Sequence, residues 1–163
     1  FSYPDSSIFR LLSDERINAD KPLARELGCQ VGDEWVQIAG LRTLGEEGVP
    51  ICLADVYVIP EYGSIAQRLG TSSRPVYEMI AETFKESIEN ITIRLTAGVL
   101  SVRKAAVLGV EPGAPSLSVS RFYEGRGGRI FEVSISEHPA SNFSYTFEFT
   151  RGWQTADHWS WSN

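Results

Sequence analysis

Residues 108–149 constrain the fold of this chain more than any other stretch. They read LGVEPGAPSLSVSRFYEGRGGRIFEVSISEHPASNFSYTFEF and contain three strand-like runs, 116–123, 130–136 and 143–149. Turn sequences rich in glycine and proline separate the runs, and strands joined by short connections are usually antiparallel neighbours. We therefore predict an antiparallel meander that carries polar side chains on one face.

The first half of the chain predicts a helix followed by a hairpin. Asp20 and Gly28 are typical of the two ends of a short helix over 21–27, because aspartate caps free amides and glycine adopts the left-handed conformation. Two β-rich runs, 34–44 and 49–59, flank the sequence GEEG and predict a hairpin. Both runs are apolar on both parities, which predicts central strands covered on each face.

The remaining segments complete a mixture of helices and strands. Ser72 or Ser73 is expected to begin a second helix that has Pro75 in its first turn and apolar residues at helical spacing as far as Ile88. An alternating, half-buried strand is expected at 91–100 and a short helix at 102–108. Residues 1–20 predict one short strand and a loop. These elements together indicate the α+β class.

Composition excludes several classes of protein. With 163 residues, 42% hydrophobic and 22% charged, the chain is expected to form one soluble globular domain. A net charge of -6 opposes binding of a nucleic-acid backbone by this chain alone. No apolar run is long enough for a transmembrane helix, and the N-terminal residues do not have the pattern of a signal peptide. The sequence begins with Phe1 instead of Met, which suggests that an upstream segment is missing.

Few residues have the spacing that catalysis or metal binding needs. Cys29 and Cys52 lack metal-ligand spacing and suit reduced thiols in the cytosol, so we predict no metal and no cofactor. Only His138 and His158 are present, and neither a GxSxG nor an HExxH motif occurs. We predict no catalytic residue and exclude a hydrolase.

A row of polar residues follows the middle strand of the meander. Glu132, Ser134 and Ser136 share the parity opposite to the apolar residues of that strand, and His138 continues the row just beyond it. Either this row is a solvated sheet face or it lines a site. Arg121 shares parity with apolar residues of the preceding strand and is either a core ion pair, an edge position or a ligand contact.

Arg42 and Asp55 raise a similar question in the first hairpin. A hairpin closed around GEEG would set Arg42 opposite Ile51 and Asp55 opposite Ile38, so the two charges could not pair with each other. A polar pocket on the covered side of the sheet would accommodate both, and Arg42 could bind a carboxylate or phosphate there. The alternative is that both lie at exposed strand ends.

Several strings resemble the UTRA domain, the effector-binding domain of HutC-subfamily GntR transcription regulators. They are LARELGCQVGDEWVQIAGLR, VPICLADVYVIP, RPVYEMI and the meander itself. The resemblance implies a chorismate-lyase-like fold over residues 1–151, with a mainly antiparallel sheet and flanking helices around a ligand cleft, and leaves 152–163 as a tryptophan-rich tail. It also implies a cytoplasmic homodimer that binds DNA through an N-terminal winged helix-turn-helix, which no part of this chain matches.

The resemblance also implies site residues. It implies Arg42, Asp55, Tyr77 and Glu132, with His138 and Ser141 near the polar positions that follow. Together with Arg121 and Ser134 from the strand pattern, the predicted effector-binding set is Arg42, Asp55, Tyr77, Arg121, Glu132, Ser134, His138 and Ser141. Relatives that bind sugar phosphates have a second arginine where this chain has Gly40 and a serine where it has Pro75. We therefore expect a smaller effector, such as a carboxylate-bearing metabolite. Two alternatives are a chorismate-lyase-like enzyme that uses Arg42 and Glu132, and a stand-alone binding module.

Overall fold

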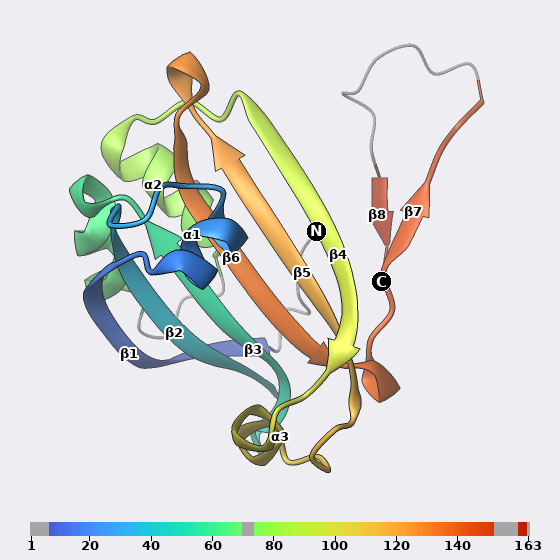
Figure 1. The fold of residues 1–163 in the computed structure, drawn as a ribbon. Coiled ribbons are helices and arrows are strands. Elements are labelled where there is room, and N and C mark those ends of the chain that lie inside the picture. Colours follow the sequence, from blue (N-terminus) through green and yellow to red (C-terminus); the bar gives the residue numbers. More distant parts are fainter. Residues whose placement is uncertain (1–6, 70–73, 152–159, 163) are drawn as a thin grey trace.

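The computed structural model describes residues 7–69, 74–151 and 160–162. Its body is a six-stranded sheet of order β1-β2-β3-β6-β5-β4, in which all neighbouring strands are antiparallel (Figure 1). The strands are β1 (Ser7–Asn18), β2 (Glu34–Leu44), β3 (Val49–Val58), β4 (Asn90–Val99), β5 (Pro115–Glu124) and β6 (Ile130–Pro139). The α+β class and the mainly antiparallel sheet are thus confirmed.

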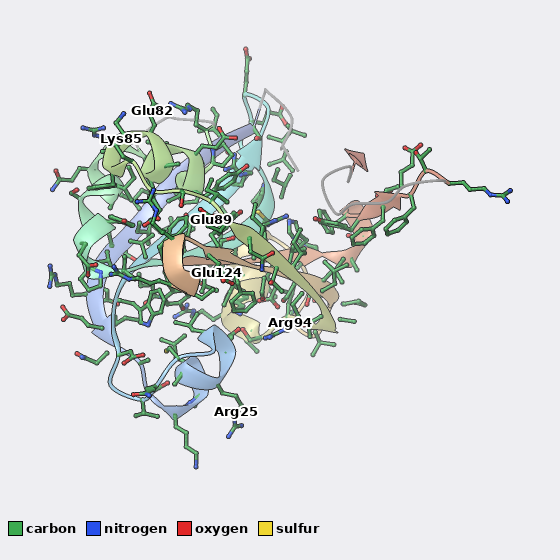
Figure 2. The ribbon with its side chains drawn as sticks, turned by 90° about the horizontal axis from the view of Figure 1, so that it is seen from above. Arg25, Glu82, Lys85, Glu89, Arg94 and Glu124 are labelled. Atoms are coloured by element: carbon green, nitrogen blue, oxygen red, sulfur yellow. The ribbon has the colours of Figure 1, made fainter. Side chains whose placement is uncertain are left out.

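Helices cover both faces of this sheet. The helices α1 (Lys21–Leu27) and α3 (Val102–Leu108) cover one face, which we call the α1 face. The 3-10 helix η1 (Pro60–Arg68) and α2 (Val76–Phe84) cover the other, the α2 face; the short turns η2 (Arg126–Gly128) and η3 (Ala140–Asn142) follow β5 and β6. Seen from above, Arg25 of α1 and Glu82 of α2 lie on opposite sides of the sheet (Figure 2).

The two short helices have the ends expected from their sequences. In α1 the Asp20 carboxylate accepts a hydrogen bond from the Leu23 amide at 2.9 Å, and Gly28 closes the helix with φ 71°. In α3 the Ser101 hydroxyl accepts from the Lys104 amide, and Gly109 closes the helix with φ 69°. Local capping therefore determines both helices.

Replacing Asp20 with alanine is expected to lower the free energy of unfolding by about 1 kcal/mol, because the first turn of α1 loses its side-chain cap. Urea denaturation of the two proteins measures the difference. Asp14→Ala, which removes an exposed carboxylate from β1, is the matched control and should change stability by less than about 0.5 kcal/mol. Equal effects of the two substitutions would contradict the capping role of Asp20.

Hydrophobic residues form a large and a small core. The large cluster includes the fully buried Ile38, Val58, Ile80 and Phe131 and joins the sheet to η1 and α2. The small cluster packs α3 on the sheet and consists of Leu41, Leu53, Leu100, Ala105 and Leu108. Because β2 and β3 contribute to both clusters, the prediction that they are covered on each face is confirmed.

Some boundaries differ from the predictions. The strand β1 extends over 7–18, because it pairs along its length with β2 instead of giving way to a loop. The helix α2 ends at Phe84, since Lys85 adopts the left-handed conformation with φ 57°, and Pro75 precedes the helix instead of lying in its first turn. Ile88 is therefore outside the helix; Ser72 and Ser73 lie outside the described residues.

The third predicted strand of the meander does not join the main sheet. Residues Thr146–Glu148 form β7, which pairs with β8 (Ser160–Ser162) in a hairpin that stands apart from the six strands (Figure 1). The reason is topological: β3 and β5 already occupy both sides of β6, so no edge is available beside it. Residues 152–159 and 163 of the tryptophan-rich tail lie outside the described residues.

The edge strand β4 is more exposed than its alternation predicted. Ile91, Leu95 and Val99 are 43%, 38% and 69% exposed, respectively. Within the described part of the chain, β4 pairs only with β5. The backbone of its outer edge is therefore unpaired there, and its apolar side chains are exposed. The expected half-buried strand is thus an edge strand with an exposed apolar row.

Candidate functional site

Strand register brings several predicted site residues onto the α2 face. Arg121 of β5 lies opposite Ser134 of β6, and Tyr123 lies opposite Glu132. Directly opposed residues of antiparallel strands project to the same face, so Arg121 and Glu132 are diagonal neighbours. The ring of Tyr77, from α2, stacks on Tyr123 with centroids 4.5 Å apart. We call these five residues the Arg121–Glu132 cluster.

The cluster is buried, contrary to a solvated sheet face. Glu132 is 2% exposed, Arg121 7% and Ser134 9%, whereas Tyr77 is half-buried. The alternation of β5 and β6 turns these polar groups toward α2 instead of toward water. A row of polar side chains that is covered by a helix requires either internal partners or a ligand.

Glu132 has an unusual electrostatic environment. Complete burial raises its pKa to about 8, because the charged carboxylate loses its hydration, and the nearby Arg121 guanidinium opposes this shift only in part. Its Oε2 atom is buried and has no hydrogen-bond partner among the described residues. At neutral pH Glu132 is therefore mostly an uncharged carboxylic acid that can donate a hydrogen bond.

The two tyrosines of the cluster are also uncharged at neutral pH. Burial raises the pKa of Tyr77 and raises that of Tyr123 well above its usual value. The Tyr77 hydroxyl donates to the Glu78 Oε1 atom at 3.3 Å, and Ser134 hydrogen-bonds to the Tyr123 hydroxyl. Among these side chains Arg121 supplies the guanidinium, a group that pairs with anions.

Arg42 belongs to a separate group at the other end of the same face. It is 8% exposed, its Nη1 atom donates to the Ser7 hydroxyl at 3.2 Å, and its guanidinium lies 5.7 Å from the Phe9 ring centroid. The Phe9 ring lies directly over Gly40. The position at which sugar-phosphate-binding relatives are expected to have a second arginine is thus covered by an aromatic ring.

Arg42 and Glu132 do not meet. Arg42 lies opposite Cys52 in β3, whereas Glu132 lies opposite Val58, six residues further along that strand. Six residues of extended strand span roughly 20 Å. The predicted pairing of Arg42 with Ile51 was wrong by one residue, because the register shifts between Arg42 and Thr43. Arg42 and Glu132 therefore do not lie together in one cleft, contrary to the expectation.

Asp55 lies on the opposite face from Arg42. Its Cα partner is Ala39, not Ile38, and its carboxylate accepts a hydrogen bond from the Gln37 side-chain amide at 3.2 Å. The same amide donates to the Tyr57 hydroxyl, whose pKa is raised by burial and by Asp55. The expectation that one pocket would accommodate Arg42 and Asp55 was thus wrong, since odd and even strand positions face opposite sides.

His138 lies within β6, not beyond it, and is 1% exposed. Its Nδ1 atom donates to the Leu117 carbonyl at 3.2 Å, and its ring stacks on Phe143 with centroids 3.7 Å apart. Burial lowers the pKa of His138 to about 4, so the ring is neutral at pH 7. Ser141 is exposed in η3, away from the Arg121–Glu132 cluster.

Three residues were missing from the predicted set. Tyr123 shares the parity of Arg121, which was visible in the sequence, but only the Tyr77 stack identifies it as part of the cluster. Phe9 and Phe143 come from segments whose contacts with Arg42 and His138 have no local sequence signal. The Phe9 contact depends on the pairing of β1 with β2, and the Phe143 contact on the turn η3 that separates it from His138.

The described ranges of the chain are 7–69, 74–151 and 160–162. They contain no group of three or more His, Cys, Asp or Glu side chains arranged to hold a metal ion. Cys29 and Cys52 are not joined by a disulfide. None of the helices within these ranges combines the length and the apolar character that crossing a membrane requires.

Comparison with known proteins gives one family match. The family model of the UTRA domain matches residues 5–144 of the sequence. No curated protein sequence matches the chain significantly.

Three solved structures with a similar fold are described as a regulator or as a domain of one, or named PhnF. A GntR-family transcriptional regulator from Bacillus cereus superposes with a TM-score of 0.74 at 17% identity, covering 90% of this chain and 100% of that one. PhnF from Mycobacterium smegmatis gives 0.73 at 18% identity, covering 89% of this chain and 63% of PhnF. The ligand-binding domain of a protein described as a GntR-family regulator from Bordetella bronchiseptica gives 0.67 at 23% identity, with 96% and 87% covered.

Proposed function

Because this chain belongs to the UTRA family, we propose that it is the small-molecule effector-binding domain of a cytoplasmic GntR regulator of the HutC subfamily. Effector binding would modulate DNA binding by a winged helix-turn-helix outside this sequence. The observation that carries the proposal is the buried Arg121–Glu132 cluster, in which polar side chains from β5, β6 and α2 converge on one face.

The proposed effector is a carboxylate-bearing metabolite. Arg121 supplies the positive charge, and its planar guanidinium matches a carboxylate. The Phe9 ring over Gly40 supports a less charged ligand than a phosphosugar, because no second arginine is present at that position. Of the other predicted residues, Tyr77, Glu132 and Ser134 belong to the cluster, while Arg42, Asp55, His138 and Ser141 lie outside it.

Replacing Arg121 with glutamine is expected to weaken effector binding at least tenfold, since the ligand carboxylate loses its cationic partner. A thermal-shift screen of the wild-type protein against a metabolite library identifies the ligand, and calorimetry measures its affinity for each variant. Arg16→Gln, which removes an exposed arginine of β1, is the matched control. Equal affinities for all three proteins would remove Arg121 from the site.

We also propose that the domain forms a homodimer through β4. The exposed apolar row of β4 is uninterrupted by charge on its own parity, whereas the opposite edge strand β1 exposes Arg10 and Asp14 beside its exposed Ile8 and Leu12. Charged edges oppose strand pairing, whereas an apolar edge favours it. Ile93 of β4 lies opposite Arg121, so a dimer interface on β4 would be one strand away from the cluster.

Replacing Leu95 with lysine is expected to weaken the dimer at least tenfold, because an ammonium group would be buried at the interface. Sedimentation over a range of concentrations measures the dissociation constant. Val107→Lys on α3 is the matched control, since Val107 and Leu95 are both 38% exposed. A monomeric wild-type protein, or equal effects of the two substitutions, would contradict the interface on β4.

A regulatory role is favoured over a chorismate-lyase-like enzyme. That alternative required Arg42 and Glu132 to act as a pair, and roughly 20 Å of strand separates their positions. Incubation with chorismate, followed by detection of product, tests the alternative directly. Turnover that is lost in Glu132→Gln would overturn the regulatory proposal.

A further inference from the structure

We propose that two copies of this chain exchange arms: the C-terminal arm of each copy, residues 144–151 together with β8, packs its aromatic face on the exposed apolar row of the partner's β4. This inference rests on the β4 homodimer proposed above. It adds a second surface to that interface and identifies a second copy of the chain as the partner that covers it.

The C-terminal arm has one aromatic face. Tyr145, Phe147 and Phe149 alternate with Thr146 and Glu148, and residues of one parity in extended chain project to the same side. The ring centroids of Tyr145 and Phe147 lie 4.9 Å apart, yet Phe147 is still 40% exposed and Phe149 60%. A two-stranded hairpin is only marginally stable by itself in water, so this face favours packing on an apolar surface.

The arm leaves the body on the face that carries the apolar row of β4. Its base is anchored where Phe143 stacks on His138, on the α2 face. Leu117 lies opposite His138 and Ala97 opposite Leu117, so Ala97 projects to the same face as His138. Ala97 has the parity of the apolar row, and the row therefore lies on the side of the sheet from which the arm starts.

The direction of the arm selects the row of the partner. In both views the arm extends beyond β4, on the side of the sheet away from β1 (Figure 1, Figure 2). An antiparallel pair of β4 strands has its two-fold axis perpendicular to the sheet, which keeps the α2 faces of both copies on one side. The partner's sheet then continues beyond the same edge, and the arm lies over the partner's β4.

The area of the interface also favours the exchange. A stable dimer buries on the order of 800 Å² on each copy. One edge strand with three exposed apolar side chains supplies only part of such an area. Each exchanged arm adds its aromatic face and covers the row that strand pairing alone leaves exposed.

The exchange places the partner's aromatic side chains near the Arg121–Glu132 cluster. Ile93 of β4 lies opposite Arg121, and Ile91 lies opposite Tyr123. The partner's arm therefore covers the strand next to the cluster, so the dimer interface and the proposed effector site share β5 as their common neighbour.

The double variant Phe147→Ser with Phe149→Ser tests the arm. It is expected to raise the dissociation constant of the dimer about tenfold or more, because two aromatic rings no longer pack on the partner. Sedimentation over a range of concentrations measures the constant, and circular dichroism checks that the sheet is kept. Glu148→Ser, on the opposite side of β7, is the matched control and should follow the wild type.

Cross-linking tests which copy each arm covers. Leu95→Cys and Phe147→Cys are made in separate chains, which are mixed and treated with a short bis-maleimide. Mass spectrometry is expected to find peptides that join position 95 of one chain to position 147 of the other. The wild type, which keeps Cys29 and Cys52, gives the background.

Several outcomes would overturn the exchange. If Leu95→Lys weakens the dimer and the arm variant does not, the β4 homodimer stands without exchanged arms. If only the arm variant weakens it, the arms pair with each other and β4 is not their partner. If positions 95 and 147 are linked only when both thiols are in one chain, each arm covers its own β4. A monomeric wild type rejects both the homodimer and the exchange.

Discussion

Replacing Glu132 with glutamine is expected to remove a pH-dependent loss of stability. The folded-state pKa of Glu132, about 8, lies above the ordinary value of 4.5, so the folded protein holds a proton that the unfolded chain releases between these values. The stabilising effect of that proton is complete below pH 4.5 and declines as pH rises to about 8. Between pH 6.5 and 8 the wild type should lose up to about 2 kcal/mol, at about 1.4 kcal/mol per pH unit.

Urea denaturation between pH 6.5 and 9 measures this effect as the difference between wild type and Glu132→Gln. That range avoids the titration of His138, whose contribution is complete above pH 6.5 and declines as pH falls toward about 4. Glu15→Gln is the control and should keep the wild-type slope. A Glu132→Gln variant whose stability declines as steeply as that of the wild type would show that Glu132 is ionised in the folded protein.

Replacing Gly40 with alanine is expected to destabilise the fold by about 1–3 kcal/mol. A Cβ atom at this position would lie 2.7 Å from Cε1 of Phe9 and closer still to Cζ and Cε2, so the ring would have to leave its buried place. Phe9 would also lose its contact with the Arg42 guanidinium. Thermal or urea unfolding measures the change.

Two companion variants make the Gly40 prediction specific. Gly98→Ala in β4 is the matched control, because a Cβ there meets only the Ser116 hydroxyl at 3.8 Å. Phe9→Val removes the overlapping ring, so the double variant Gly40→Ala with Phe9→Val should be more stable than the sum of the single effects implies. Additive effects, or equal costs at Gly40 and Gly98, would show that Phe9 does not occupy the space over Gly40.

Local signals in the sequence predicted several elements well. The helices α1 and α3 have the predicted boundaries, because Asp20, Gly28 and Gly109 act within one or two turns of themselves. The two-residue period of extended chain placed Glu132, Ser134 and Ser136 together in β6, and the structure confirms that they share a face. These features depend on residues that are near one another in the chain.

Most of the predictions that failed required knowledge of distant neighbours; the early end of α2 is an exception, since Lys85 stops that helix locally. The third run of the meander leaves the sheet because β3 occupies the second side of β6, and β3 lies some 80 residues earlier. A register shift beside Arg42 moved its partner from Ile51 to Cys52. Arg42 and Asp55 were predicted to share one pocket because both are charged, but their strand positions place them on opposite faces of the sheet.

The sequence by itself determined which side chains share a strand face and where the short helices begin and end, since both depend on local geometry. Only the tertiary structure decided that α2 covers the row of Arg121 and Glu132, that Arg42 stands apart from it, and that β4 is an exposed edge. Strand order and helix placement follow from burial of the whole apolar surface, which no local pattern specifies. The polar row of β6 is for this reason a buried cluster, not a solvated face.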